Sequence, residues 1–388
     1  MINLTRLIGD ENASFWGDAL RYGKQASANP VVVWNCTRRC NLRCVHCYAA
    51  SEARADPNEL TTDEAKAFFD DLAAFGAPVL LVSGGEPLLR EDLFELLPYA
   101  TKKGLRTVIS TNGTCITPDV AQKISAAAVA YVGVSLDAAD AKRNDEFRGC
   151  DGAFENALAG LRACREAGIK VGVRFTMTRR NLDQIDGLFD LIEREEIPRV
   201  CFYHFVPAGR GKDNLTTAPW HSQVRDAVDV ILARTRSLDQ VGRGVEVLTV
   251  DNHADGPYVY LQLLREDPAR ASKAMTLLKR NGGNRSGVGI ACVAWDGAVL
   301  PDQFWRSRVL GNVRETPLSE IWSRRTAGTL LEQLRNRKQF LQGRCMSCRF
   351  LEICNGNLRA RAEAAGLGLW GDDPACYLTD EEIREAVP

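Results

Sequence analysis

Short apolar runs alternate with amphipathic stretches through the first half of the chain. The first run extends from Pro30 to Trp34 and is rich in valine, and similar runs follow at 79–82, 106–110, 131–136, 170–176 and 199–206. Continuous apolar runs with β-branched side chains are typical of strands that are buried on both faces, as the strands of a parallel sheet are. The pattern therefore predicts six strands.

The stretches between these runs carry signals for helices. A helix is predicted to begin at Thr61, where Glu64 completes a capping box, and to end at Gly76. Further helices are predicted at 117–127, 154–167 and 183–195. Strands that alternate with helices in this way indicate an α/β fold with a parallel sheet, and a partial (β/α)6, TIM-like barrel is the simplest closure.

This alternation is expected to end near Gly211. We expect four parts: residues 1–29 as a polar lead-in, 30–211 as the partial barrel, 212–280 as a helical connection and 281–388 as a second domain. The connection is predicted to contain two long helices, at 220–236 and 258–279. The stretch 281–289, rich in glycine and asparagine, marks the boundary, and a hairpin over 289–302 with its turn at Asp296-Gly297 is predicted after it.

Composition and charge narrow the class of protein further. The 388 residues include 49 basic and 50 acidic side chains, so the overall charge attracts neither nucleic acid nor an anionic membrane. No apolar run reaches about 18 residues and no secretory signal is found near the start, so a cytoplasmic location is expected. The thirteen cysteines fall mainly into two dense groups, which in that compartment indicates metal binding rather than disulfides.

The first dense group of cysteines lies in the loop after the first predicted strand. Cys40, Cys44 and Cys47 are separated by three and then two residues. With this spacing, three thiolates can bind three irons of one 4Fe-4S cube and leave the fourth iron open to a small molecule. A zinc site and three cysteines buried for packing are the alternatives. Cys36 does not fit both intervals and is expected to be a bystander.

A glycine-rich motif follows the second predicted strand, at an end where the reactive groups of such barrels gather. It comprises Gly84, Gly85, Glu86 and Pro87. The glycines allow a ligand to approach the backbone closely, and the carboxylate can accept a hydrogen bond from an ammonium group. A plain glycine turn explains the motif equally well.

Polar side chains also mark the fourth and fifth predicted strands. Ser135 and Asp137 alternate at the end of the fourth, so both can face one side and bind the hydroxyls of a ribose. Arg174 interrupts the apolar fifth strand, and a cation inside a barrel needs an anionic partner.

Together these motifs resemble those of the radical S-adenosylmethionine (SAM) enzymes, and the resemblance covers the first 210 residues. It implies that the first three cysteines hold a 4Fe-4S cluster whose open iron chelates SAM, which is then cleaved to a 5'-deoxyadenosyl radical. It implies further that Gly84 to Pro87 hold the SAM amino group. Ser135 and Asp137 match the ribose side, and Arg174 matches the carboxylate partner.

The second group of cysteines resembles the SPASM extension of radical SAM enzymes. Its members are Cys345, Cys348, Cys354 and Cys376, and four thiolates can ligate a second 4Fe-4S cluster completely, with zinc as the alternative. Leu358 and Asp302 stand where the extension usually has further cysteines, so a single auxiliary cluster is expected. The remaining cysteines are expected to be small core residues: Cys36, Cys115, Cys150, Cys164, Cys201 and Cys292.

Longer stretches extend the resemblance over nearly the whole chain. Residues 202–211, 248–256, 302–305, 354–362 and 373–378 look like those of the radical SAM enzymes that trim siroheme-derived tetrapyrroles. One branch of that group removes two acetates from didecarboxysiroheme and yields iron-coproporphyrin III for haem synthesis. The other removes two propionates on the way to haem d1. The opening segment and the cysteine loop favour the deacetylase.

The resemblance also implies partners and substrate contacts. An iron-tetrapyrrole substrate is expected, together with an electron donor such as flavodoxin or ferredoxin. A planar, polyanionic iron macrocycle needs cations and an iron ligand near the barrel mouth. The candidates for these contacts are His204, Arg210, His253, Arg306 and Arg308.

Two other functions remain open from the sequence. One is a SPASM peptide maturase, against which stands the short segment of 39 residues before Cys40, too small for a peptide-gripping domain. The other is a non-catalytic metal scaffold, which would have no use for the SAM-amine motif at Gly84 to Pro87.

Overall fold

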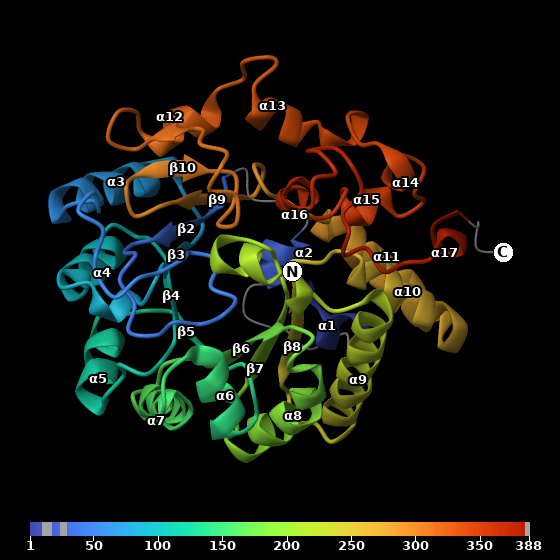
Figure 1. Ribbon diagram of the computed structural model, residues 1–388, viewed down its shortest axis with the longest axis horizontal. Coiled ribbons are helices and arrows are strands. Elements are labelled where there is room, and N and C mark those ends of the chain that lie inside the picture. The colour runs from blue at the N-terminus through green and yellow to red at the C-terminus, as the bar shows by residue number, and fades with distance from the viewer. Residues whose placement is uncertain (10–17, 24–28, 385–388) are drawn as a thin grey trace.

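The computed structural model describes residues 1–9, 18–23 and 29–384. An 11-stranded sheet forms its centre, in the order β1-β8-β7-β6-β5-β4-β3-β2-β9-β10-β11, with helices around it (Figure 1). The strands are β1 (Ile2–Asn3), β2 (Val31–Asn35), β3 (Leu80–Ser83), β4 (Thr107–Thr111), β5 (Tyr131–Ser135), β6 (Val171–Met177), β7 (Arg199–His204), β8 (Glu246–Val250), β9 (Ile290–Val293), β10 (Ala298–Leu300) and β11 (Gly311–Asn312).

Strands β2 to β8 pair in parallel and in chain order. All six predicted strands are present, and the predicted fold class, a partial TIM-like barrel, is confirmed. The prediction that the alternation ends near Gly211 is wrong, because α9 (His221–Gln240) leads on to β8, which pairs in parallel with β7. Residues 246–250 are themselves a run rich in β-branched side chains, so the signal for this strand was present.

The two faces of the parallel sheet differ in polarity. Apolar side chains such as Val32, Val132 and Val173 point toward the helices and belong to the main hydrophobic core. Several side chains that alternate with the core residues are polar and keep partial exposure: Ser110, Tyr131, Ser135, Arg174, Thr176 and Tyr203. The inner face of the barrel therefore presents polar groups to an interior that is not completely filled.

Helices cover the outer face of the barrel. They are α3 (Thr62–Phe75), α4 (Leu93–Lys102), α5 (Pro118–Ala126), α6 (Ala141–Arg148), α7 (Ala153–Glu166) and α8 (Ile185–Arg194), followed by α9. The capping box is confirmed: Thr61 N donates to Glu64 Oε2 at 2.8 Å, and Glu64 N donates to Thr61 Oγ1 at 3.3 Å. Gly76 ends α3 with φ +75°, a conformation that favours glycine.

The single helix predicted at 258–279 is in fact two helices, α10 (Asp255–Glu266) and α11 (Pro268–Asn281). Pro268 has no backbone N–H and disfavours helical geometry at the residue before it, so the chain breaks at Asp267. Part of the expected lead-in, residues 10–17 and 24–28, lies outside the described residues. Its first strand, β1, pairs antiparallel with β8, and α1 (Leu4–Ile8) and α2 (Asp18–Tyr22) follow.

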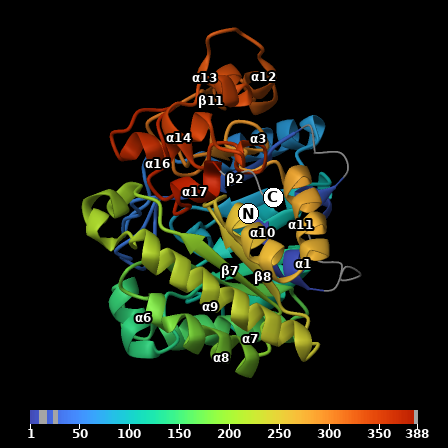
Figure 2. The same ribbon diagram turned by 90° about the vertical axis from the view of Figure 1, so that its right-hand side faces the viewer.

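The C-terminal segment continues the sheet at its other edge. β9 pairs in parallel with β2 and antiparallel with β10, which confirms the predicted hairpin. Short helices complete the segment: α12 (Leu318–Ser323), α13 (Leu330–Arg335), α14 (Gly343–Met346), α15 (Leu351–Cys354), α16 (Arg359–Ala364) and α17 (Asp380–Arg384). Their orange and red ribbons lie together at one end of the molecule in both views (Figures 1 and 2).

Among the described residues, none of the helices has both the length and the apolar character needed to cross a bilayer.

Candidate functional site

The loop that carries Cys40, Cys44 and Cys47 follows the C-terminal end of β2, as predicted. Their side chains pack together with Leu42 and Ala153. Burial, together with the neighbouring thiols of Cys47 and Cys40, raises the pKa of the Cys44 thiol to about 11, although Arg148 acts to lower it. Ionised thiols repel one another, and bound metal cations stabilise them as thiolates. This group of cysteines is therefore suited to hold iron.

The spacing of these thiols bears on the zinc alternative. Within the described part of the chain, no three His, Cys, Asp or Glu side chains are arranged to hold one metal ion. A zinc ion needs all four ligands within about 2.3 Å of it, whereas a cube binds each thiolate through a different iron and so keeps its cysteines further apart. The cysteines are therefore not arranged as a preformed zinc site.

The glycine motif after β3 is packed against the start of the cysteine loop. A Cβ atom at Gly84 or Gly85 would lie closer than 3.0 Å to the carbonyl oxygens of Thr37 and Arg39 respectively. In addition, Gly85 N donates to Thr37 O at 2.7 Å, and Glu86 N donates to Arg39 O at 2.8 Å. The two glycines thus allow a close approach that fixes the cysteine loop to the end of β3.

The carboxylate of Glu86 is completely buried and links β3 to β4. Its Oε1 accepts hydrogen bonds from Thr111 Oγ1 at 2.7 Å and from Leu88 N at 3.1 Å, and its Oε2 accepts one from Asn112 N at 2.8 Å. These bonds use three of the roughly four acceptor positions of a carboxylate. Glu86 therefore braces the loop, and its contact with a SAM ammonium group stays a prediction.

Asp137 lies at the end of β5 but is turned toward the cysteine loop. Its Oδ2 is 2.6 Å from Arg148 Nη2 and 3.6 Å from His46 Nε2, and its Oδ1 accepts a hydrogen bond from Thr176 N at 3.1 Å. Arg148 in turn donates to Cys44 Sγ at 3.8 Å. Both oxygens of Asp137 are thus engaged within the protein, and its contact with a ribose stays a prediction.

Ser135 and Arg174 lie opposite each other on β5 and β6. The guanidinium of Arg174 stacks over the ring of Tyr203 at 4.6 Å. Tyrosines and Cys201, rather than carboxylates, are the groups that act on it most strongly. A cation in this setting is suited to bind an anionic ligand, as the sequence predicts.

Arg210, which follows β7, binds the cysteine loop that follows β2. Its Nε donates to Cys44 O at 3.1 Å, its Nη1 donates to Ser51 O, and its backbone N donates to Cys47 O at 3.0 Å. A Cβ atom at Gly209 would lie closer than 3.0 Å to the carbonyl oxygen of Cys47. The structure therefore gives Arg210 a part in fixing the cluster loop, and its predicted contact with substrate is untested.

The two histidines expected near the substrate are buried and engaged. His204 Nε2 lies 2.8 Å from Asp255 Oδ2, and its Nδ1 lies 3.5 Å from Asn252 Nδ2. His253 Nε2 lies 3.1 Å from the amino group of Met1, and its Nδ1 is buried without a hydrogen-bond partner. Both ring nitrogens of His204 are thus engaged, whereas His253 keeps one free nitrogen that is buried, and contact of either histidine with a bound iron stays a prediction.

The arginines Arg306 and Arg308 lie on the surface and pair with carboxylates. Arg306 forms an ion pair with Asp296, with Nη1 3.0 Å from Oδ1, and stacks over Trp295 at 4.5 Å. Arg308 forms an ion pair with Glu363, with Nε 2.9 Å from Oε1. Arg306 shares the ring of Trp295 with Arg38, which lies just before Cys40. Contact of either arginine with substrate stays a prediction.

Two cavities lie beyond the C-terminal ends of the strands. One of about 320 Å³ is lined by Asp137, Ala138, Arg143, Glu146, Phe147, Arg180 and Asn181. The other, of about 220 Å³, lies between the barrel and the C-terminal segment, and its lining includes Met177, His204, Phe205, Arg361 and Pro374. The first is at the small end of the range of about 300–1,000 Å³ for ligand pockets, and the second is below it.

The second group of cysteines also converges. Cys345 and Cys348 lie in and just after α14, Cys354 ends α15, and Cys376 comes from the final loop. Burial raises the pKa of Cys354 well above its usual value, and the thiols of Cys376, Cys345 and Cys348 raise it further. Four thiols that act on one another can each bind a different iron of one cube, as the predicted auxiliary cluster requires.

The residues at the positions that depart from the SPASM pattern are engaged within the protein. Asp302 is buried, and its Oδ2 accepts a hydrogen bond from Ser286 Oγ at 2.6 Å. Leu358 packs in an apolar cluster with Trp305 and Leu334. Neither side chain is available to a second auxiliary cluster.

The single cysteines only partly match their expected burial. Cys36, Cys164, Cys201 and Cys292 are buried, but Cys115 is partly exposed and Cys150 is exposed. The core prediction is wrong for Cys150 because this residue lies in the turn between α6 and α7 rather than on a helix face. All thirteen cysteines are free thiols.

Sequence reasoning missed Arg148 and Asp251. Arg148 ends the short, polar helix α6 and looks in the sequence like an ordinary basic residue at a helix C-terminus. Asp251 directly follows β8, the strand that the sequence analysis did not predict. The φ of Asp251 is +67°, a value that is rare for a residue other than glycine. This conformation is seen in the structure but has no signal in the sequence.

These features agree with comparisons to known proteins. Residues 34–192 match the Radical SAM superfamily, and residues 286–349 match the SPASM iron-sulfur cluster-binding domain. SuiB of Streptococcus suis, solved with S-adenosylmethionine bound, has a similar fold with a TM-score of 0.70 and 19% identity, over 90% of this chain and 78% of that one.

The chain therefore belongs to the radical SAM enzymes that carry a SPASM domain. Within them it is similar to two enzymes of tetrapyrrole synthesis. Fe-coproporphyrin III synthase of Methanosarcina barkeri is 54% identical, over 94% of this chain and 95% of its own. Pre-heme d1 synthase of Dinoroseobacter shibae is 41% identical, over 94% of this chain and 90% of its own. The predicted family, enzyme class and cofactors are confirmed, and a non-catalytic scaffold does not agree with this membership.

Proposed function

We propose that the protein removes the two acetate side chains of didecarboxysiroheme and releases iron-coproporphyrin III. The observation that carries the proposal is its higher identity to Fe-coproporphyrin III synthase than to pre-heme d1 synthase, over nearly the whole length of each. Removal of two propionates from the same precursor is the second candidate, favoured by the likeness to pre-heme d1 synthase.

The residues present fit the cofactors that this activity needs. Cys40, Cys44 and Cys47 would hold the SAM cluster, which together with SAM supplies a 5'-deoxyadenosyl radical that abstracts a hydrogen atom from the substrate. The chain fixes this loop through Gly85 and Arg210. The auxiliary cluster would be held by Cys345, Cys348, Cys354 and Cys376.

The SAM contacts remain part of the proposal. Gly84 to Pro87 follow the C-terminal end of β3, Ser135 ends β5 with Asp137 two residues later, and Arg174 lies in the middle of β6. Arg174 is supported best, since the groups that act on it most strongly are tyrosines and Cys201 rather than carboxylates. The Gly84 to Pro87 segment would bind SAM through its backbone, because the Glu86 side chain is engaged with Thr111 and Asn112.

The electron donor and the location complete the proposal. A flavodoxin or ferredoxin would reduce the SAM cluster, and the protein would work in the cytoplasm. The thirteen free thiols support this location, because cytosolic thiols are kept reduced.

Anaerobic turnover tests the function. Reconstituted protein is incubated with SAM, dithionite and didecarboxysiroheme, and the products are identified by mass spectrometry. We expect 5'-deoxyadenosine and a tetrapyrrole that has lost both acetates. Loss of both propionates would support the second candidate instead, and no 5'-deoxyadenosine would contradict both. Cys44→Ala should abolish turnover, whereas Cys164→Ala, at a buried cysteine in α7, should not.

A further inference from the structure

Asp251 ends β8 with a backbone conformation that few residues adopt. Its φ is +67°, in the left-handed region that favours glycine. Residues in this region persist when the surrounding structure enforces the conformation, and they gather at functional sites. The contacts that enforce it and the direction of the side chain are therefore informative.

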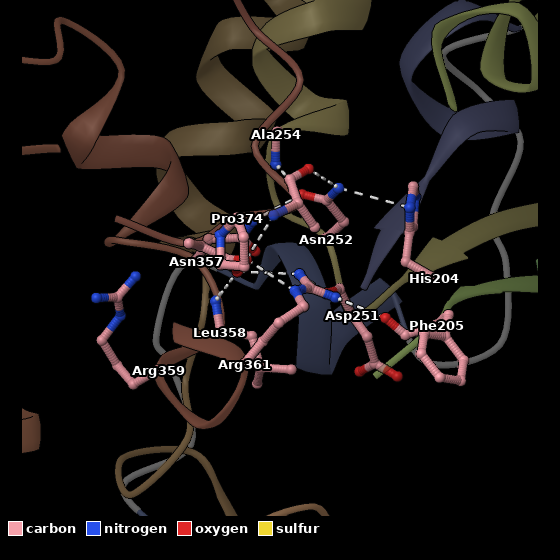
Figure 3. A network of polar contacts seen from close by, with 12 residues as sticks. His204, Phe205, Asp251, Asn252, Ala254, Asn357, Leu358, Arg359, Arg361 and Pro374 are labelled. Carbon is pink, nitrogen blue, oxygen red and sulfur yellow. Dashed lines mark hydrogen bonds and ion pairs between the residues drawn. The ribbon is translucent and has the colours of Figure 1, made fainter. Parts of the chain in front are cut away.

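The C-terminal segment holds the backbone of this turn (Figure 3). Arg361 Nη2 donates to Asp251 O at 2.8 Å. Asn357 accepts a hydrogen bond from His253 N at 2.8 Å through its Oδ1 and donates one to Asn252 Oδ1 at 2.7 Å through its Nδ2. Three consecutive residues after β8 are thus bound by side chains from the segment that carries the second group of cysteines.

Arg361 is itself fixed by a buried ion pair. Its Nε and Nη2 lie 2.7 Å and 3.0 Å from the two oxygens of Asp373, and its Nη1 donates to Phe205 O at 3.2 Å. Asp373 comes three residues before Cys376. The conformation of Asp251 is therefore maintained by residues next to a predicted ligand of the auxiliary cluster.

The carboxylate of Asp251 takes no part in this network. In Figure 3 no dashed line reaches its oxygens, and its Oδ2 is buried without a hydrogen-bond partner. The pKa of Asp251 is raised to about 6. Burial is the largest cause and Asp302 adds to it, whereas the amino group of Met1, Arg361 and Arg174 act to lower the pKa. A buried carboxylate without a donor is costly, so a ligand that supplies a hydrogen bond stabilises it.

The groups around this carboxylate lie on the inner face of the barrel. Tyr203 lies opposite Val250 in the register of β7 and β8, and the Asp251 carboxylate acts on its phenol. Arg174 on β6 stacks over Tyr203. Asp251, Tyr203 and Arg174 all remain partly exposed. Three neighbouring strands thus present an acid, a phenol and a guanidinium toward the interior.

We propose that Asp251 binds a carboxylic acid side chain of the tetrapyrrole and shares one proton with it, an inference that rests on the proposed function. Two carboxyl groups in contact cannot both be ionised, so they share a proton, and the pair carries one negative charge. The nearby cations that would compensate this charge are the amino group of Met1 and the guanidinium of Arg361, which act on Asp251 more strongly than Arg174 does. The auxiliary-cluster segment would then act on substrate binding by maintaining the Asp251 turn.

Substrate binding without turnover tests this inference. Didecarboxysiroheme is titrated anaerobically, without SAM, into the reconstituted protein and followed by its absorption spectrum. Asp251→Gly removes the carboxylate and suits positive φ, so it should fold and bind about 10- to 100-fold more weakly. Asp251→Asn keeps a donor and tolerates the left-handed conformation, so it should lose less than Asp251→Gly. Glu196→Gly is the matched control, because Glu196 is an acidic residue with φ +49° on the loop before β7.

A substrate with esterified side chains separates direct contact from a structural role. If Asp251 shares a proton with a substrate acid, the wild-type protein and Asp251→Gly should bind the ester equally. The inference would be overturned if both proteins bound the free acid with equal affinity. It would also be overturned if Asp251→Gly bound the ester as much more weakly than the wild-type protein as it binds the free acid. If the wild-type protein does not bind the free acid at all, the proposed function fails, and this subsite fails with it.

Discussion

The guanidinium of Arg210 donates a hydrogen bond to the carbonyl oxygen of Cys44 at 3.1 Å, although 166 positions separate the two residues. Gly209 next to it allows the two backbones to meet. The end of the last predicted barrel strand is thus attached to the loop at the end of the first. Because the cysteine loop has no regular secondary structure of its own over most of its length, such contacts hold its thiols in place.

Arg210→Met should weaken retention of the SAM cluster. The variant keeps an apolar side chain of similar length but loses the donors to Cys44 O and Ser51 O. Removing groups that orient metal ligands typically costs 10- to 100-fold in metal affinity, and we expect about that effect here. Release of iron to a chelator measures it. Arg306→Met, which breaks a surface ion pair, is the control, and equal release from both variants would contradict the role.

Glu86→Gln should destabilise the barrel by about 1–3 kcal/mol, because an amide cannot accept from all three donors and leaves a buried N–H unpaired. Denaturant unfolding under anaerobic conditions measures the change. Glu95→Gln, on the exposed face of α4, should change stability by no more than about 0.5 kcal/mol. Were the two variants equally stable, Glu86 would not be the brace between β3 and β4 described above.

Arg361→Met should cost about 3–5 kcal/mol, since it leaves the carboxylate of Asp373 buried without its partner. Arg308→Met removes an ion pair that is partly exposed to solvent and should cost about 0–1 kcal/mol. Unfolding in denaturant compares the two. The double variant Arg361→Met with Asp373→Leu should recover part of the loss. No difference between the single variants would show that the buried pair contributes little.

Acid should remove the contribution of Glu64. Hydrogen bonds from Arg314 and from the backbone of Thr61 lower its pKa to about 2, against about 4.3 when unfolded. A lowered pKa stabilises the folded state above the unfolded pKa, and this stabilisation is lost as the pH falls toward 2. Wild type should therefore be more stable than Glu64→Gln at pH 6, by no more than about 1 kcal/mol at this solvent-screened site. The difference should shrink on acidification, and a constant difference would contradict the assignment.

Removal of two auxiliary ligands should halve the iron content. Cys354→Ala with Cys376→Ala leaves the second site with two thiolates, too few for a cube, so iron should fall from about eight to about four atoms per chain. The electron paramagnetic resonance signal of the reduced SAM cluster should persist. Cys164→Ala is the control for loss of a buried thiol. Loss of zinc rather than iron would identify the second site as a zinc site.

The sequence predicted those parts of the fold that depend on local chemistry. The valines of β2, the capping box at Thr61 and the turn at Asp296-Gly297 are each signalled by residues that are neighbours in the sequence, and all three elements are present. The helix predicted at 258–279 shows the limit, because its apolar period continues across Pro268 while the backbone does not.

The site was predictable only where spacing along the chain reflects a shared ligand. The cysteines could be found this way. Arg148, Arg210 and Arg361 take their roles from partners far away in the chain, at Cys44 Sγ, Cys44 O and Asp251 O respectively. For Arg210 the residue was identified but its contacts were not, because a charged side chain looks the same in sequence whether it binds a ligand or the backbone.

The parallel pairing of β9 with β2 has a consequence for any attempt to shorten the protein. Deleting residues 281–388 would remove β9 and leave one side of β2 with unpaired amides and carbonyls. Bare strand edges of this kind recruit other chains and aggregate. The unpaired strand would be β2, which leads directly into the loop that carries Cys40, Cys44 and Cys47. A truncated barrel would therefore expose an aggregation-prone edge beside thiols that are easily oxidised.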